Sequence, residues 1–230
     1  ETVDRLGPKV AVIARPGIGV DMIDTQAATQ RGIMVVNTPD GPTESTAEHA
    51  IALMLNLAKG VSIADRVLRS GTGFPRYGTL SPGLELRGAT LGLVGLGRIG
   101  GRVAEIARVL GMRVLAFDPF LSSERATQLG VHQIATLEEL LPQADIVSLH
   151  CPATPATEHL INATTLALMK PGSYFINVAR GAIVDEQALI TALQNRYLAG
   201  AGLDVFDPEP TIADHPLYKL PNTIVTPHIA

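Results

Sequence analysis

The sequence predicts an α/β protein built around a parallel sheet, and two observations support this prediction. Short, nearly continuous apolar runs alternate with helical patterns from Gly88 onward in the 230-residue chain. Strands that are apolar on both faces are typical of parallel sheets covered by helices on both sides. The second observation is a glycine-rich turn, Gly95-x-Gly97-x-x-Gly100, which joins one such strand to a helix. Ligands of such sheets bind beyond the carboxyl ends of the strands, so we expect the functional site there.

The glycine turn has the layout of a dinucleotide-binding βαβ unit. It lies between an expected strand and an expected helix, and a second strand follows: 89–94, 98–110 and 113–117. Gly95 permits the tight turn, Gly97 lets a pyrophosphate approach the backbone, and Gly100 lets the helix pack close to the strand. N–H groups at the helix start would hold the phosphates, and Asp118 stands where a ribose-binding acid is expected. The alternative is an ordinary glycine-rich turn with a helix-capping Asp, which the strand–helix–strand context disfavours.

The remaining elements follow from the same patterns. Apolar runs predict further strands at 9–14, 33–36, 145–149, 173–178, 199–205 and 223–226. Helical periodicity predicts helices at 21–31, 43–69, 136–141 and 185–195. We expect the first of these strands to be buried and the first helix to end at Gly32. The long helix is apolar enough to pack on both sides and to bridge two domains.

Composition excludes several classes of function. The net charge is −4 and no run of Lys and Arg occurs, which argues against a nucleic-acid surface. The single cysteine, Cys151, excludes an internal disulfide and fits a reducing cytosol. No apolar stretch is long enough to cross a bilayer, and no signal peptide is apparent. The chain opens at Glu1 and stops at Ala230 directly after a strand-like run, so we expect a fragment of a longer protein.

Three reactive side chains follow expected strands near the end of the chain: Arg180, Glu209 and His228. A hydride-transfer enzyme that acts on a hydroxy acid needs these chemistries. His228 could exchange the hydroxyl proton near neutral pH, and a carboxylate such as Glu209 could orient the imidazole. An arginine can bind a substrate carboxylate through two parallel hydrogen bonds. Taken singly, each could instead be a surface charge, a solvated turn residue or a packing residue.

In these motifs the chain resembles the D-isomer-specific 2-hydroxyacid dehydrogenases, and most closely their D-3-phosphoglycerate dehydrogenase branch. The matching stretches are RPGIGVDMID at 15–24, VNTPDGPTESTAEH at 36–49, LGLVGLGRIG at 91–100, FDPF at 117–120, NVARGAIVDE at 177–186, LDVFDPEP at 203–210 and TPHIA at 226–230. The resemblance implies a Rossmann-type cofactor domain at 73–230, part of a flavodoxin-like substrate domain at 1–42 and a bridging helix at 43–72. It also implies a homodimer. The single cysteine and the lack of an apparent signal peptide predict a cytoplasmic location.

The resemblance also assigns roles to individual residues. It makes Arg180 the group that binds substrate carboxylate and carbonyl, Glu209 the partner of the histidine, and His228 the proton donor in carbonyl reduction. It places Ile18 and Gly19 in a loop that reaches substrate. The implied cofactor-binding residues are Gly95, Gly97, Arg98, Ile99, Gly100, Asp118, Cys151, Val178, Ala179 and Asp204. No metal is implied.

Two questions concern the cofactor and the reaction. Asp118 would repel a 2′-phosphate and is followed by Pro119 rather than Arg, which favours NAD over NADP. The expected reaction interconverts a D-2-hydroxy acid and its 2-oxo acid, with D-3-phosphoglycerate as one candidate. An NAD(H)-sensing, corepressor-like binding protein is the alternative, and a related formate or phosphite dehydrogenase is a third hypothesis.

Overall fold

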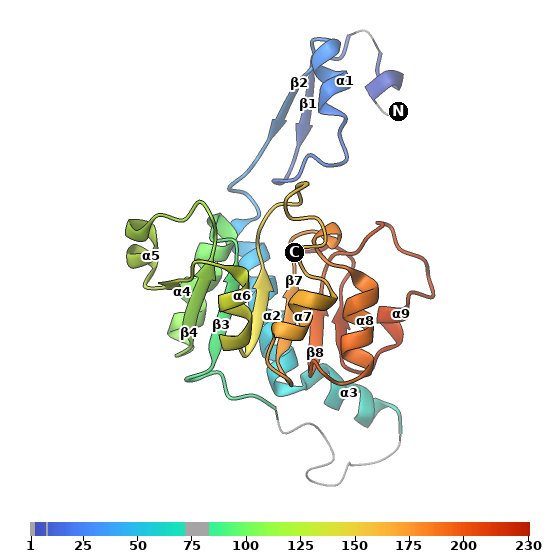
Figure 1. The fold of residues 1–230 in the computed structure, drawn as a ribbon. Helices are drawn as coiled ribbons and strands as arrows, with labels where there is room; N and C mark the ends of the chain where they lie inside the picture. The colour runs from blue at the N-terminus through green and yellow to red at the C-terminus, as the bar shows by residue number, and fades with distance from the viewer. Residues whose placement is uncertain (1–2, 8, 72–82) are drawn as a thin grey trace. The chain divides into compact units, whose positions relative to one another are not determined.

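The computed structural model describes residues 3–7, 9–71 and 83–230 (Figure 1). The chain folds into two compact units, Glu1–Ser45 and Thr46–Ala230. Each unit has its own hydrophobic core, and each is described by itself below.

The first unit contains two parallel strands, β1 (Val12–Arg15) and β2 (Met34–Asn37). They are connected by α1 (Thr25–Gln30), and a short 3-10 helix, η1 (Val3–Arg5), precedes them. Val3, Ala28 and Ile33 form a small core that also receives the side chains of Ile13 and Val35.

The prediction that the strand over 9–14 is buried is wrong. β1 begins at Val12, which is 50% exposed, and its register partner Met34 is 62% exposed. Strand residues alternate between faces, so Ile13 and Val35 reach the small core whereas Val12 and Met34 point to the opposite face. A pair of strands packed on one face only can bury half of its side chains.

The single helix predicted over 43–69 is two helices in the structure. α2 (Thr43–Lys59) ends before Gly60, which adopts the left-handed conformation with φ of 63°, and α3 (Val61–Arg69) begins after it. The two helices differ in their packing. α2 contributes apolar residues from Ala47 to Ala58 to the second unit's core, whereas none of the residues of α3 is buried. Glycine adopts a positive φ without steric cost, which explains why the helix is interrupted there.

The second unit is a seven-stranded, entirely parallel sheet. Its strands, in chain order, are β3 (Thr90–Val94), β4 (Arg113–Phe117), β5 (His132–Gln133), β6 (Ile146–Leu149), β7 (Tyr174–Asn177), β8 (Gly200–Leu203) and β9 (Thr223–Val225). Their spatial order is β5-β4-β3-β6-β7-β8-β9. Every residue of the central strands β3, β6, β7 and β8 is buried. This arrangement confirms the predicted α/β class and the Rossmann-type sheet.

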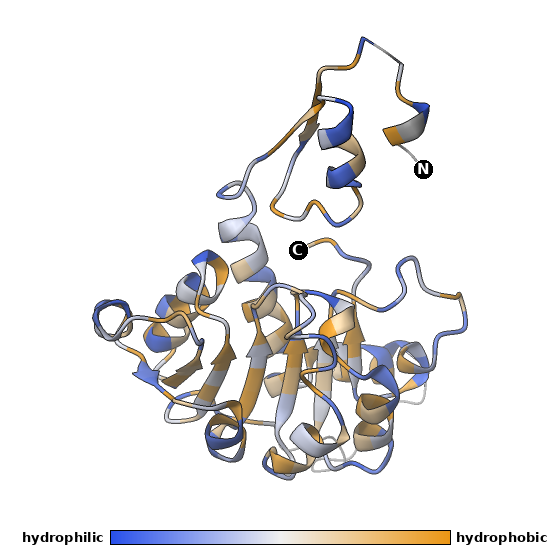
Figure 2. Ribbon diagram, turned by 45° about the horizontal axis from the view of Figure 1, so that its top comes forward, coloured by the Kyte–Doolittle hydropathy of each residue, from blue (hydrophilic) through white to orange (hydrophobic). Residues whose placement is uncertain are grey.

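Helices cover both faces of the sheet (Figures 1 and 2). They are α2, already described, and α4 (Arg98–Val109), α5 (Ser123–Leu129), α6 (Leu137–Leu140), α7 (Ala163–Leu168), α8 (Glu186–Gln194) and α9 (Pro216–Lys219), with the 3-10 turns η2 (Leu141–Gln143) and η3 (Gly181–Ile183). One apolar cluster contains residues of α2, α4 and α5, and the other contains residues of α6, α7, α8 and α9. The chain order reverses between β3 and its neighbour β6, so the topological switch point lies where β3 and β6 end.

Candidate active site

A single row of register partners crosses the sheet near the carboxyl ends of its strands. Neighbouring strands contribute Phe117, Val94, Leu149, Asn177, Leu203 and Val225 in that order. Each site residue predicted in the second unit lies in the segment that follows one of these positions. Because the strands are parallel, those segments emerge at the same edge of the sheet. The structure thus brings the glycine turn, Asp118, Cys151, Arg180 and the Glu209–His228 segments to one edge.

The glycines of the turn differ in what surrounds them. Gly95 has a φ of +92°, and a Cβ there would lie 2.7 Å from the Cys151 backbone nitrogen. A Cβ on Gly100 would lie 2.3 Å from the Gly95 carbonyl oxygen, so only glycine allows α4 to approach the turn this closely. Gly97 caps α4, and a Cβ there would meet nothing within 4 Å. The open space at Gly97 suits the close approach of a pyrophosphate.

Asp118 connects the end of β4 to the glycine turn. Its Oδ2 accepts a hydrogen bond of 2.8 Å from the Leu96 N–H, and its Oδ1 accepts one of 2.8 Å from the Phe120 N–H. Each carboxylate oxygen keeps a further lone pair for a ribose hydroxyl. Arg98 and Ile99 open α4, where backbone N–H groups lack carbonyl partners within the helix. These donors and the helix dipole favour an anion, so the residues of this end fit a dinucleotide.

Two side chains at the end of β6 have pKa values shifted by burial. Burial lowers the pKa of His150 from 6.5 to about 4, because the charged imidazolium loses its hydration. Its Nε2 lies 2.9 Å from the Ser148 Oγ, and its buried Nδ1 has no hydrogen-bond partner among the described residues. Burial also raises the pKa of the Cys151 thiol to about 11, with a smaller contribution from the Asp118 charge. Both groups are therefore neutral at pH 7.

His228 and Glu209 form a close pair. The His228 Nδ1 lies 2.6 Å from the Glu209 Oε2, and the two side chains are 45% and 32% exposed. The second carboxylate oxygen, Oε1, accepts a hydrogen bond of 2.8 Å from the Phe206 N–H. This pairing fixes the ring so that Nε2 is directed away from the carboxylate and can exchange a proton with a ligand. The geometry is that of an imidazole oriented by a carboxylate.

Asp204 holds the backbone around His228. The Asp204 side chain is fully buried, and its Oδ1 accepts hydrogen bonds from the Thr226 hydroxyl at 2.6 Å and the Ile229 N–H at 3.0 Å. Its Oδ2 accepts the Ala230 N–H at 2.9 Å, and its backbone carbonyl accepts the His228 N–H at 2.8 Å. His228 has a φ of 54°, an uncommon value for a residue with a side chain. Bonds on both sides of His228 maintain that conformation.

The residue predicted as a cofactor contact, Asp204, thus uses both carboxylate oxygens within the chain. His49 of α2 extends this network, because its Nε2 lies 3.0 Å from the Thr226 Oγ1 and 3.6 Å from the Asp204 Oδ1. Val178 and Ala179, also predicted to line the cofactor, are 6% and 8% exposed. These side chains offer a cofactor little accessible surface.

Arg180 lies in the loop after β7, and its backbone is held by Asn177. The Asn177 side chain donates to the Arg180 carbonyl at 2.8 Å and accepts from the Ala179 N–H at 3.0 Å. The Arg180 Nη1 donates to the Ala179 carbonyl at 2.6 Å. The loop is packed directly against the one that carries Glu209, because a Cβ on Gly181 would lie 2.0 Å from the Phe206 carbonyl carbon.

Gly181, Thr226 and His49 are residues that sequence reasoning missed. Gly181 stands inside the NVARGAIVDE stretch, so the motif itself marked it, but its contact with Phe206 depends on a segment far away in the chain. His49 likewise ends the VNTPDGPTESTAEH stretch, yet its partner Thr226 lies 177 positions away.

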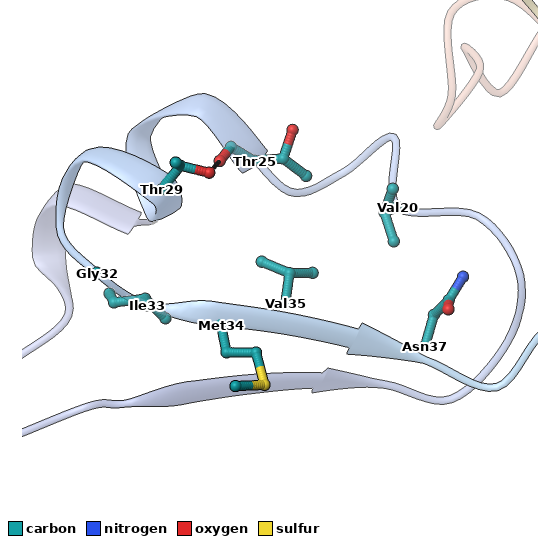
Figure 3. Close-up of a pocket in the computed structure, with 8 residues that line it drawn as sticks. All are labelled: Val20, Thr25, Thr29, Gly32, Ile33, Met34, Val35 and Asn37. Carbon is teal, nitrogen blue, oxygen red and sulfur yellow. Dashed lines mark hydrogen bonds between the residues drawn. The ribbon is translucent and has the colours of Figure 1, made fainter.

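The other predicted substrate contacts, Ile18 and Gly19, belong to the first unit and follow β1. The Ile18 carbonyl accepts a hydrogen bond of 2.8 Å from the Asn37 amide, which fixes this loop to the end of β2. A hollow of about 580 Å³ also lies in this unit (Figure 3). Its lining residues are Val20, Thr25, Thr29, Gly32, Ile33, Met34, Val35 and Asn37. None of these side chains is an acid, a base or a strong nucleophile, so the hollow has no catalytic chemistry.

Within 3–7, 9–71 and 83–230, no group of three or more His, Cys, Asp or Glu side chains could hold a metal ion. Over the same residues, no helix is both long enough and apolar enough to cross a membrane.

The sheet order, the glycine turn and the segments at its edge define a Rossmann-type NAD-binding domain. Residues 51–230 match the family model described as "D-isomer specific 2-hydroxyacid dehydrogenase, NAD binding domain". The chain therefore belongs to the D-isomer-specific 2-hydroxyacid dehydrogenase family. This confirms the resemblance drawn from the motifs.

Individual relatives agree with this assignment. The chain is 49% identical over 219 residues to D-3-phosphoglycerate dehydrogenase of Archaeoglobus fulgidus, covering 95% of this chain and 41% of that protein. The crystal structure of the TT0316 protein from Thermus thermophilus is 47% identical, with a TM-score of 0.85 over 93% of this chain and 66% of that one. A Granulicella formate dehydrogenase structure is 33% identical, with a TM-score of 0.90 over 96% and 59% of the two chains. The chain spans about two fifths of the length of the curated relatives.

Proposed function

We propose that the protein containing this chain is an NAD-dependent D-2-hydroxyacid dehydrogenase. The observation that supports this most strongly is the His228–Glu209 pair, which emerges at the same sheet edge as the glycine turn. Arg180 occupies the neighbouring loop and supplies a guanidinium for a carboxylate. The relatives named above as D-3-phosphoglycerate dehydrogenases make that compound the first substrate to test. We assign 1–42 to the substrate-binding domain, 43–72 to the bridging segment and 73–230 to the NAD-binding domain.

Each of these side chains has one task in the proposed reaction. NAD, when bound, supplies the redox chemistry. Arg180 binds the substrate carboxylate and polarises the adjacent carbonyl. In the reduction direction, the His228 Nε2–H gives its proton to the carbonyl oxygen of the 2-oxo acid. Glu209 holds Nδ1 and stabilises the protonated ring by its negative charge. In oxidation, the unprotonated Nε2 accepts the hydroxyl proton.

The first test replaces the proposed acid–base group. His228→Ala in the natural full-length protein should lower kcat by about 10²- to 10⁴-fold, the usual contribution of a positioned acid or base. NADH affinity, measured by fluorescence titration, should stay near the wild-type value because His228 is remote from the glycine turn in the strand order. His132→Ala is the matched control, since His132 is an exposed residue of the edge strand β5. Wild-type turnover in His228→Ala would end the proposal.

The second test removes the charge of Glu209 and keeps its shape. Glu209→Gln should shift the alkaline limit of carbonyl reduction to lower pH, because the amide no longer stabilises the imidazolium. The measurement is the pH profile of kcat/KM. A profile that coincides with that of the wild type would show that Glu209 does not act on His228.

The cofactor preference rests on Asp118. Its carboxylate lies at the glycine turn, where it would accept hydrogen bonds from ribose hydroxyls and repel a 2′-phosphate. Asp118→Ala should therefore weaken NAD binding more than NADP binding, as measured by titration with each nucleotide. Equal losses for the two nucleotides would contradict this role.

The alternatives are less well supported. A corepressor-like sensor is not favoured, because the named relatives are dehydrogenases. The likeness to a formate dehydrogenase is a reason to include formate in a substrate panel beside D-3-phosphoglycerate and D-lactate. We also propose a cytoplasmic homodimer that binds no nucleic acid, and sedimentation of the full-length protein would test its assembly.

A further inference from the structure

The loop that carries Glu209 is held by a pair of side chains outside the proposed acid–base pair. This loop runs from the end of β8 to the start of α9. Glu186 opens α8, and its Oε2 lies 3.0 Å from the Nε2 of His215, the residue that caps α9. The two side chains are only 17% and 12% exposed. The other Glu186 oxygen, Oε1, accepts a hydrogen bond of 3.1 Å from the Asp207 N–H. One carboxylate therefore joins both ends of the loop.

The contacts of His215 fix its orientation. Its Nδ1 accepts a hydrogen bond of 3.4 Å from the Leu217 N–H at the start of α9. With Nδ1 as acceptor, the ring proton of the neutral imidazole resides on Nε2 and points to Glu186. His215 thus connects the cap of α9 to the start of α8.

Aromatic contacts hold the same loop from inside. The His215 ring lies edge-on to Phe206 with centroids 5.7 Å apart, and Tyr218 lies 5.4 Å from Phe206 and 5.3 Å from His215. Phe206 is 7% exposed. The Tyr218 hydroxyl also bonds the Thr211 hydroxyl in the far part of the loop. Together these contacts determine where the Phe206–Asp207 backbone lies.

That backbone in turn determines which oxygen of Glu209 faces His228. The Phe206 N–H donates to Glu209 Oε1, which leaves Oε2 for the His228 Nδ1. The adjacent Asp207 N–H donates to Glu186. A shift of this peptide segment would therefore move the carboxylate relative to the imidazole.

We infer that Glu186 and His215 are positioning residues that hold Glu209 against His228. The inference rests on the proposed function, because it assigns Glu186 and His215 an effect on turnover through that acid–base pair. They touch neither substrate nor cofactor in this assignment. Their effect is to fix the loop that presents the carboxylate.

The experiment uses the natural full-length protein. Glu186→Ala should lower kcat by about tenfold to a hundredfold, the range expected when a reacting group is displaced by about 1 Å. NADH affinity should remain at the wild-type value. Glu186→Gln keeps an oxygen for the Asp207 N–H, so its kcat should lie between those of the wild type and Glu186→Ala. Glu124→Gln is the matched control, because Glu124 is an exposed acid in the first turn of a helix far from this loop in the strand order.

Substitutions at His215 separate positioning from packing. His215→Gln places its amide nitrogen close to the position of Nε2 and keeps a donor for Glu186, so it should keep more of the wild-type kcat than His215→Phe. His215→Phe preserves a ring beside Phe206 but loses both hydrogen bonds. Equal kcat values for these two variants would overturn the inference, provided that urea unfolding shows both to be folded. If one of the two His215 variants does not fold, the comparison of Glu186→Gln with Glu186→Ala takes its place.

A double-mutant cycle distinguishes failure of this inference from failure of the proposed function. If Glu186 acts through Glu209, Glu186→Ala should cost much less in the Glu209→Gln background than in the wild type. Additive losses would overturn the positioning role. If Glu209→Gln slows turnover but Glu186→Ala does not, only the positioning role is wrong. If Glu209→Gln itself leaves turnover and its pH profile unchanged, the proposed acid–base pair is wrong.

Discussion

The candidate site lies along one edge of the sheet, and its cofactor end and its histidine end are stabilised in different ways. The glycine turn and Asp118 belong to one βαβ unit, β3–α4–β4, and the Asp118 carboxylate bonds back to the turn within that unit. The histidine end collects residues from α2 and from the segments that follow β8 and β9. His49 and Thr226, which meet there, are 177 positions apart. The cofactor end is therefore encoded locally, whereas the acid–base end depends on the assembled sheet.

The largest expected effect tests the histidine end. Asp204→Ala would leave the Ile229 and Ala230 N–H groups and the Thr226 hydroxyl without their acceptor. An orphaned buried donor costs about 1–3 kcal/mol, but Ile229 is 63% exposed and water can replace part of the lost bonding, so we expect a loss of about 3 kcal/mol in the free energy of unfolding. Urea unfolding measures it, with the exposed Asp65→Ala of α3 as control. A loss below about 1 kcal/mol would show that Asp204 does not anchor this segment.

His150, at the switch point between the two ends, gives a pH-dependent test. Its pKa is about 4 when folded and about 6.5 when unfolded, so the unfolded chain binds more protons between these values. Stability therefore rises with pH across this window and is lost as pH falls from 6.5 toward 4. Linkage gives a contribution on the order of 3 kcal/mol.

The measurement for His150 is urea unfolding at pH 7.5 and pH 5. The His150→Gln variant should lose less stability than the wild type between these pH values. His132→Gln, at an exposed histidine, should behave like the wild type. If His150→Gln and the wild type show the same pH dependence, the buried imidazole is not responsible for it.

The glycine turn offers a matched pair of substitutions at the cofactor end. Gly100→Ala would place a Cβ 2.3 Å from the Gly95 carbonyl oxygen and should destabilise the fold by about 2 kcal/mol, the range seen for overpacking. Gly97→Ala meets open space and should change stability by less than about 0.5 kcal/mol. NAD affinity should nevertheless fall in Gly97→Ala. If this variant binds NAD like the wild type, the pyrophosphate does not approach there.

The smallest expected effect concerns the chemical reactivity of the Cys151 thiol and does not involve the stability of the fold. Because burial raises the pKa of its thiol to about 11, almost no thiolate is present at pH 8. Iodoacetamide should therefore alkylate the folded protein much more slowly than the urea-unfolded chain, as followed by mass spectrometry. NAD should slow alkylation further if Cys151 lines the cofactor site. Equal rates for the folded and unfolded chain would show that the thiol is accessible.

Local sequence patterns were enough to predict the cofactor end and the order of the elements. The Gly95-x-Gly97-x-x-Gly100 spacing and the alternation of apolar runs with helical patterns are local properties, so they predicted the Rossmann-type sheet that the structure confirms. The same patterns placed Arg180, Glu209 and His228 after strands. The periodicity of apolar residues continues through Gly60, so it could not show that the left-handed conformation of this glycine divides the long helix. It could not show that β1 is exposed either, because exposure depends on what packs against the strand.

Only the tertiary structure shows which contacts stabilise the acid–base end of the site. The Asp204 carboxylate, the contact of Gly181 with Phe206 and the Glu186–His215 pair join segments whose proximity comes from the parallel register of β7, β8 and β9. A motif records which residue types stand at which spacing. It does not record which buried donor meets which acceptor, because hydrogen bonds between distant segments are fixed by the packing of the whole sheet.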